Sequence, residues 1–192
     1  MKNSLIYQND TPIKHDDVKF ITVNRFDEDA LNKFYEKFLE LDLRPEIKVI
    51  PIVINSYGGN VSALLGMLDI MKLTNKPVAT IALGKAMSCG AVLLSAGTKG
   101  YRYAGAHTSI LIHEVSSSAG GKTADLENEL KDVKNLNNKL MRLLAKNCGL
   151  KNKDYFLTKS RKNANVDLYY SAEESRKLGL IDFVSVPRFL KG

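Results

Sequence analysis

A serine between small residues is the first feature of this sequence that could do chemistry. Residues 84–91, GKAMSCGA, place Ser88 after one aliphatic segment and at the start of another. This pattern is typical of a sharp turn from a strand into a helix, which raises the serine hydroxyl clear of the backbone. The pattern predicts a candidate nucleophile at Ser88, although serine at a helix start is also a common cap.

A second turn, NSYGGN at residues 55–60, carries paired glycines after another aliphatic segment. Gly58 and Gly59 can adopt positive φ angles and let backbone N–H groups approach a carbonyl oxygen. Together with the N–H group of Cys89, such a turn can hold the negative oxygen that forms during acyl transfer. Paired glycines are also ordinary turn residues, so this motif is weak when taken alone.

A serine nucleophile needs a base, and the chain has three histidines. His113 follows the aliphatic residues 109–112 and precedes a segment rich in Ser and Gly, so we expect it at the edge of the core. His15 and His107 lie in polar, loop-like stretches and are expected at the surface. A hydrogen-bonded core histidine remains the plainer interpretation of His113. For the carboxylate that orients the base, the residues alone leave Asp167 and Asp182 open.

Hydrophobic periodicity predicts the elements that must position these residues. Strands are expected at residues 18–23, 49–55, 78–83, 101–103, 109–112 and 180–184. Helices are expected from an Asp27 cap to about 41, then over 61–71, 88–95 and 124–147, and from a capping box at Ser171 to Gly179. This alternation favours an α/β fold with a parallel sheet, in which both turns lie at the carboxyl ends of strands.

Composition narrows the class of protein. The 192 residues carry 28 Lys plus Arg and 21 Asp plus Glu, a formal net charge of +7, with 44% hydrophobic residues. These values are typical of globular chains and argue against disorder or a fibrous fold. No apolar run approaches the ~20 residues of a membrane span, and the polar start does not resemble a signal peptide. With two cysteines, Cys89 and Cys148, we expect no disulfide framework and a cytoplasmic protein.

The positive charge is local, because residues 122–162 carry 11 basic and five acidic side chains. No arginine-rich block, zinc-ligand spacing or aromatic ladder accompanies this excess, so we expect no nucleic-acid binding. A solvated or subunit-contacting face is the simpler interpretation. No internal repeat or linker is evident, and we expect a single domain over 1–192, with a flexible segment at 1–17.

Taken in order, the motifs resemble the ClpP family of self-compartmentalising serine peptidases. The matching segments are INSYGG at 54–59, GKAMSCGA at 84–91, AGTKG at 96–100, IH at 112–113, DLYYSAEE at 167–174 and GLID at 179–182. The resemblance implies Ser88 as nucleophile, His113 as general base and Asp167 as the group that holds the imidazole. It also implies an oxyanion pocket from the N–H groups of Gly59 and Cys89, with Gly58 beside them.

The resemblance further implies a fold and partners. The family has a ClpP/crotonase-like spiral of ββα units with a protruding helical handle, here about residues 114–150. Its members form heptameric rings that can stack into a chamber, and they cut unfolded polypeptides delivered by AAA+ unfoldases. The substrate is expected to bind by strand addition. The resemblance implies that the chain itself needs no ATP, metal or other cofactor.

The sequence departs from the family pattern in places. Tyr57 replaces the usual proline before the glycines, Glu114 and Val115 replace Gln and Pro, and Val166 stands where an arginine commonly links ring assembly to activity. We also expect the basic excess of 122–162 to weaken ring stacking or make it depend on salt, because like charges would face each other.

The same motifs are compatible with other functions. A crotonase-like acyl-CoA enzyme would use the two backbone turns without needing Ser88, and a catalytically silent ring subunit would carry the motifs without their geometry. A Ser–Lys peptidase would use Lys85 or Lys122 as its base. A thiol peptidase built on Cys89 is discounted, because that side chain should point away from the oxygen which its own N–H group serves.

Overall fold

The computed structural model describes residues 20–117, 121–162 and 167–187. The strands are β1 (Ile21–Val23), β2 (Ile50–Ser56), β3 (Val78–Met87), β4 (Arg102–Ala104), β5 (Ser109–Ile112), β6 (Leu168–Ser171) and β7 (Phe183–Val184). The helices are α1 (Glu28–Asp42), α2 (Val61–Ile70), α3 (Cys89–Ser95), α4 (Thr123–Asn147), α5 (Tyr155–Lys162) and α6 (Ala172–Leu178). The expected segment 1–17, with His15, and also Val166 lie outside the described residues.

A mostly parallel sheet forms the centre of the fold, as the sequence predicts. Its strands run in the order β1-β2-β3-β4-β7. The long strand β3 serves two neighbours, because Thr80–Ala82 pair with β4 while Lys85–Met87 pair with β5. The antiparallel strand β6 then pairs with β5. The end of β3 therefore lies beside the strand pair β5 and β6. Ser88 is the first residue after β3.

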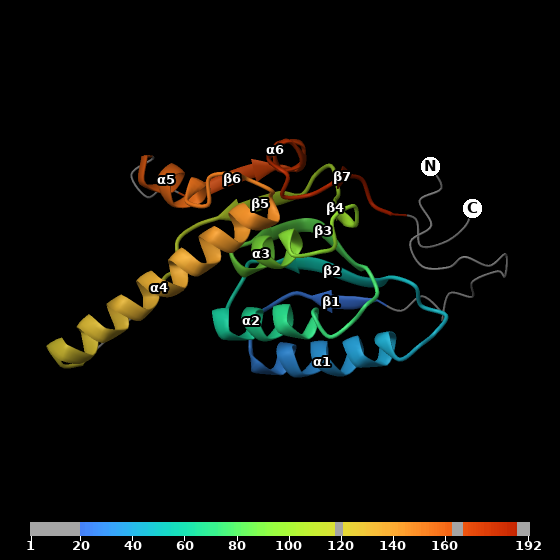
Figure 1. Cartoon of the computed structure of the whole chain (residues 1–192), viewed down its shortest axis with the longest axis horizontal. Helices are drawn as coiled ribbons and strands as arrows, with labels where there is room; N and C mark the ends of the chain where they lie inside the picture. Colours follow the sequence, from blue (N-terminus) through green and yellow to red (C-terminus); the bar gives the residue numbers. More distant parts are fainter. Residues whose placement is uncertain (1–19, 118–120, 163–166, 188–192) are drawn as a thin grey trace.

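The helices cover the sheet unequally (Figure 1). Helices α1 and α2 lie together beside β1 and β2, and α3 is buried along its whole length. Helix α4 projects away from the rest of the chain, with Leu140, Met141 and Leu144 buried near its end and Leu126 and Leu130 exposed in its first half. This projecting helix matches the arm expected from the sequence.

Predicted helix ends are confirmed. The Asp27 carboxylate accepts a hydrogen bond from the Ala30 N–H group at 2.7 Å at the start of α1. Ser171 and Glu174 form the capping box of α6, and Gly179 ends that helix with a φ of 83°. Each cap supplies partners for backbone groups that the helix leaves unpaired at its ends.

Some boundaries differ from those predicted. Strand β3 runs on to Met87 instead of ending at 83, because its last residues pair with β5. The final strand covers only Phe183–Val184, so Asp182 precedes it instead of lying within it. Helix α5 and strand β6 were not predicted. Within the described ranges, no helix is long and apolar enough to cross a membrane.

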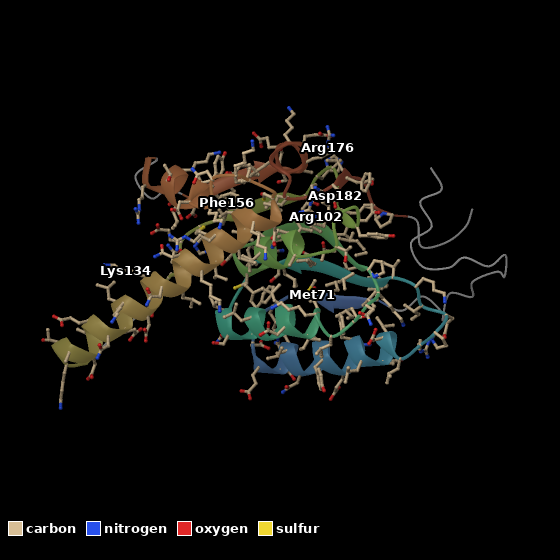
Figure 2. All side chains as sticks on the ribbon, viewed as in Figure 1. Met71, Arg102, Lys134, Phe156, Arg176 and Asp182 are labelled. Atoms are coloured by element: carbon tan, nitrogen blue, oxygen red, sulfur yellow. The ribbon has the colours of Figure 1, made fainter. Side chains whose placement is uncertain are left out.

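The basic excess of residues 122–162 lies mainly at the base of α4 and beyond it. Residues 122–135, which include the projecting half of α4 with Lys134, carry three lysines and four acidic residues (Figure 2). Residues 136–162 carry eight basic residues against Asp154. The net positive charge of the arm therefore comes from the end of α4 and the residues after it, and the projecting half is close to neutral.

Candidate active site

Ser88 occupies a strained turn between β3 and α3. Its φ of 55° and ψ of −120° make it the one non-glycine residue with positive φ among those the structure describes. Its N–H group donates to the Leu111 carbonyl at 2.9 Å, which fixes the turn against β5. The side chain makes no capping hydrogen bond, so the helix-cap interpretation is wrong. Such a backbone costs about 1–3 kcal/mol and is concentrated at functional sites.

The paired glycines lie directly against this turn. A Cβ atom on Gly58, whose φ is +105°, would stand 2.7 Å from the Ser88 Cβ atom and 3.1 Å from its hydroxyl oxygen. A Cβ atom on Gly59 would stand 2.5 Å from the carbonyl oxygen of Phe26. Only glycine fits at either position. The Gly58 N–H group donates to the Ser56 hydroxyl at 3.1 Å. It is therefore already engaged and is not free to bind a carbonyl oxygen.

Ser88 and His113 line one small cavity of about 60 Å³, together with Gly59 and Cys89. Most of the remaining wall is apolar and comes from Val61, Val92, Ile112, Val115, Leu140, Met141 and Leu144, with Ser116 and Asn137 also present. The contribution of α4 to this cavity was not predicted from the sequence. The one feature of the sequence that could have indicated it is the apolar stripe of that helix.

The three predicted catalytic residues each adjoin the end of one of three neighbouring strands, β3, β5 and β6. Ile112 pairs with Leu168 at the end of the antiparallel β5–β6 pair, and continuing that register by one residue would set Asp167 opposite His113. Side chains opposite each other in such a pair have Cβ atoms about 4.5–5.5 Å apart. On the other side of β5, Met87 pairs with Leu111, and Ser88 follows it. Asp167 is exposed, and no hydrogen bond joins the three side chains in the described part of the chain.

Asp182, the other carboxylate left open by the sequence, has a structural partner. Its carboxylate pairs with the guanidinium of Arg102 at 2.6 Å and accepts the N–H groups of Gly100 and Arg102. Burial acts to raise the pKa of Asp182, but the hydrogen bonds and charge of Arg102 outweigh it and hold that pKa below its usual value. These contacts engage Asp182 away from Ser88.

The rival bases and nucleophile are placed elsewhere or are inert. The Lys85 ammonium lies over the Tyr57 ring, outside the Ser88 cavity, and Lys122 stands at the exposed start of α4. His107 lines a different hollow near β6. The Cys89 thiol donates to the Gly59 carbonyl at 3.3 Å, and burial raises its pKa. A thiol with a raised pKa is a poor nucleophile at neutral pH.

Replacing Gly58 by alanine is expected to disable the Ser88 turn. The new methyl group must displace Ser88 in addition to adopting an unfavourable φ, and a displacement of about 1 Å can slow catalysis about 100-fold. We expect labelling of Ser88 by a fluorophosphonate to slow by about that factor. Gly149→Ala is the matched control, because Gly149 has a φ of +72° but open space around it. Equal labelling of the Gly58→Ala variant and the wild type would contradict this view of the turn.

Comparisons with known proteins agree on one family. The family model described as Clp protease matches residues 13–188. The chain is also similar to the ATP-dependent Clp protease proteolytic subunit 2 of Frankia casuarinae. The two are 34% identical over 160 residues, which cover 83% of this chain and 71% of that protein.

Proposed function

Because this chain belongs to the Clp protease family, we propose that it is a serine endopeptidase subunit in which Ser88, His113 and Asp167 form the catalytic triad. The observation that carries the proposal is the strained Ser88 turn, which opens into a cavity shared with His113. An enzyme that stabilised an oxyanion with backbone groups alone would have no use for a strained serine. The crotonase-like alternative is therefore less well supported.

Each residue has a role in the proposed reaction. The Ser88 hydroxyl attacks the substrate carbonyl while His113 accepts its proton, and Asp167 keeps the imidazole in the orientation this requires. The N–H groups of Gly59 and Cys89 stabilise the oxyanion. Gly58 contributes space instead of a donor, since its N–H group is bonded to Ser56. His113 then returns the proton to the leaving amine, and water completes the hydrolysis.

The cavity beside Ser88 indicates which type of substrate residue precedes the cleaved bond. Apolar side chains from α2, α3, α4 and the segment around His113 form most of its wall. A side chain buried there would lose contact with water and find few polar partners, so apolar residues should be favoured. Unfolded polypeptides expose such residues, which fits the substrates that the sequence resemblance implies.

Helix α4 is the proposed contact between rings. Leu126 and Leu130 are exposed on its projecting half, where acidic residues slightly outnumber lysines. If two such helices pair antiparallel, the slightly acidic projecting half of one meets the positively charged C-terminal half of the other. We therefore expect heptameric rings whose stacking weakens as salt rises, through screening of unlike charges. This replaces the repulsion expected from the sequence, and sedimentation at low and high salt measures it.

The remaining partners follow from the family. We propose that an AAA+ unfoldase delivers the polypeptide, and that the subunit works in the cytoplasm, where its two free cysteines would stay reduced. The chain's own residues supply every group used in the proposed reaction.

Fluorophosphonate labelling followed by native mass measurement tests the peptidase proposal. We expect one label per subunit in the wild-type protein, its loss in Ser88→Ala, and strongly slowed labelling in His113→Ala. Lys85→Ala and Lys122→Ala should still label, because neither lysine is the proposed base, and Cys89→Ser should do so too. Native mass reports the number of subunits in the labelled particle. An unlabelled wild-type protein that binds an acyl-CoA would instead support the crotonase-like function.

A further inference from the structure

Tyr57 and Lys85 form a cationic site that the proposed reaction does not use. The Lys85 ammonium lies 4.2 Å from the centre of the Tyr57 ring, and Tyr57 is 74% exposed. Tyr57 follows β2, while Lys85 lies near the end of β3. Across residues 20–117, 121–162 and 167–187, no carboxylate pairs with this lysine. The ring restrains the ammonium without neutralising its charge.

This pair is close to Ser88 along both chain segments. Tyr57 directly precedes Gly58, whose backbone abuts the Ser88 side chain. Lys85 stands three residues before Ser88, which corresponds to about 10 Å along a strand. A lysine side chain can span much of that distance. The ammonium can therefore reach a substrate held at the Ser88 hydroxyl.

The face of the sheet that carries Lys85 leads toward His113 and Asp167 of the proposed triad. Side chains alternate along a strand, so Lys85 and Met87 share one face of β3. The register carries that face from Lys85 to Ser109 and from Met87 to Leu111 and then Tyr169. His113 comes two residues after Leu111 and Asp167 two residues before Tyr169, so the same alternation, continued just past the ends of β5 and β6, leads to both. Tyr169 is 62% exposed, so this face is open to a bound chain.

The cavity and the cationic pair divide the substrate between them. The cavity on the His113 side takes the residue before the cleaved bond, and neither Tyr57 nor Lys85 lines it. The two parts of an extended peptide leave a scissile bond in opposite directions. Because Tyr57 and Lys85 lie outside the cavity yet close to the Ser88 turn, the part that follows the bond is the one that can pass them.

We propose that Lys85, held by the Tyr57 ring, is a specificity-determining residue that selects acidic side chains within the two residues following the cleaved bond. This inference rests on the proposed peptidase function. A carboxylate at either position gains attraction to the ammonium, whereas a basic side chain is repelled by it. At such an exposed site the effect is modest, and we expect about a five-fold preference in kcat/KM for acidic over neutral residues.

Three peptides that differ only after the cleaved bond test this inference. They carry two Glu, two Gln or two Lys residues there and the same apolar residue before the bond. We expect wild-type kcat/KM to fall in the order Glu, Gln, Lys, and the differences to shrink at high salt. Lys85→Gln should remove the preference for Glu, and Lys85→Glu should reverse the order. Tyr57→Leu should reduce the preference, because the ammonium loses its restraint. Lys37→Glu, an equal charge change on the exposed face of α1, should leave the wild-type order in place.

The outcomes separate this inference from the function on which it rests. The fluorophosphonate reacts with Ser88 without a peptide after the bond, so its labelling rate should be similar in the wild type and all four variants. An unchanged peptide order in Lys85→Glu, with normal labelling, would overturn the inference and leave the peptidase function standing. A wild-type protein that neither labels nor cleaves any of the three peptides would overturn both.

Discussion

Replacing Ser88 by alanine is expected to lower peptide hydrolysis by about four orders of magnitude or more, because Ser88 carries the hydroxyl that the strained turn holds beside His113 in the cavity. The nearest candidate, Cys89, is held by the Gly59 carbonyl, and its pKa is raised by burial. The rate of peptide hydrolysis measures the effect, with Cys89→Ser as the variant that should keep its activity. Substantial hydrolysis by Ser88→Ala would contradict the proposed mechanism.

The same position should show a conflict between activity and stability. Glycine adopts the φ of 55° seen at Ser88 without the strain that a Cβ atom brings. We expect Ser88→Gly to be inactive and yet about 1 kcal/mol more stable to unfolding than the wild type, because released strain exceeds the extra chain entropy. Ser88→Ala retains the Cβ atom and should show no such gain. Denaturant unfolding measures both variants.

A control distinguishes released strain from a general effect of glycine. Ser62 lies in the first turn of α2 and has an ordinary helical backbone, so Ser62→Gly should lower stability by about 0.5 kcal/mol. If Ser88→Gly were also destabilised, the backbone at Ser88 would not be significantly strained. The serine would then lack the signature expected of a residue held in place for function.

Local patterns in the sequence predicted the elements that carry strong periodicity or caps. The helix at Asp27, the strand before Gly58 and the capping box at Ser171 needed only neighbouring residues to be recognised. Strand β6 was missed because it is four residues long and gains its stability from pairing with β5, about 60 residues earlier. A short strand of this kind has no local pattern strong enough to reveal it.

In the site, too, local sequence predicts some features, whereas others depend on long-range pairing. The turn at Ser88 and the glycines beside it follow from local chemistry, since small residues are needed where two turns touch. The choice between Asp167 and Asp182 did not follow from local chemistry. Asp182 is engaged because Arg102, 80 residues away, folds onto it, and the register that leads toward His113 and Asp167 exists only once β5 and β6 pair. Long-range register carries information that residue types and spacing do not.

Removing Arg102 is expected to destabilise the fold by about 3–5 kcal/mol, the range for breaking one side of a buried ion pair. Its side chain is 4% exposed and that of Asp182 is 14% exposed. Arg102 also donates to the carbonyl groups of Asn147, at the end of α4, and Ser95, at the end of α3. The two side chains therefore join β4, the approach to β7 and the base of the projecting helix (Figure 2).

The destabilisation of Arg102→Met should come mostly from the carboxylate left without its partner. We therefore expect the double variant Arg102→Met with Asp182→Leu to recover much of the lost free energy of unfolding. Arg142→Met is the control, because Arg142 on α4 forms an exposed pair with Asp154, which lies between α4 and α5, and the variant should lose about 1 kcal/mol or less. A loss in Arg102→Met no larger than that of the control would contradict a structural role for the buried pair.

Lowering the pH should weaken the Arg102–Asp182 ion pair. The pKa of Asp182 is lowered on folding by Arg102, in spite of the opposing effect of burial. Its stabilisation is therefore complete above the ordinary carboxyl pKa of about 4 and is lost as the pH falls through the lower folded value. Unfolding measured from pH 7 downward should show the wild type losing its advantage over Arg102→Met in that window. Because α4 also lines the Ser88 cavity, loosening its base should slow Ser88 labelling as well, which ties this distant ion pair to the site.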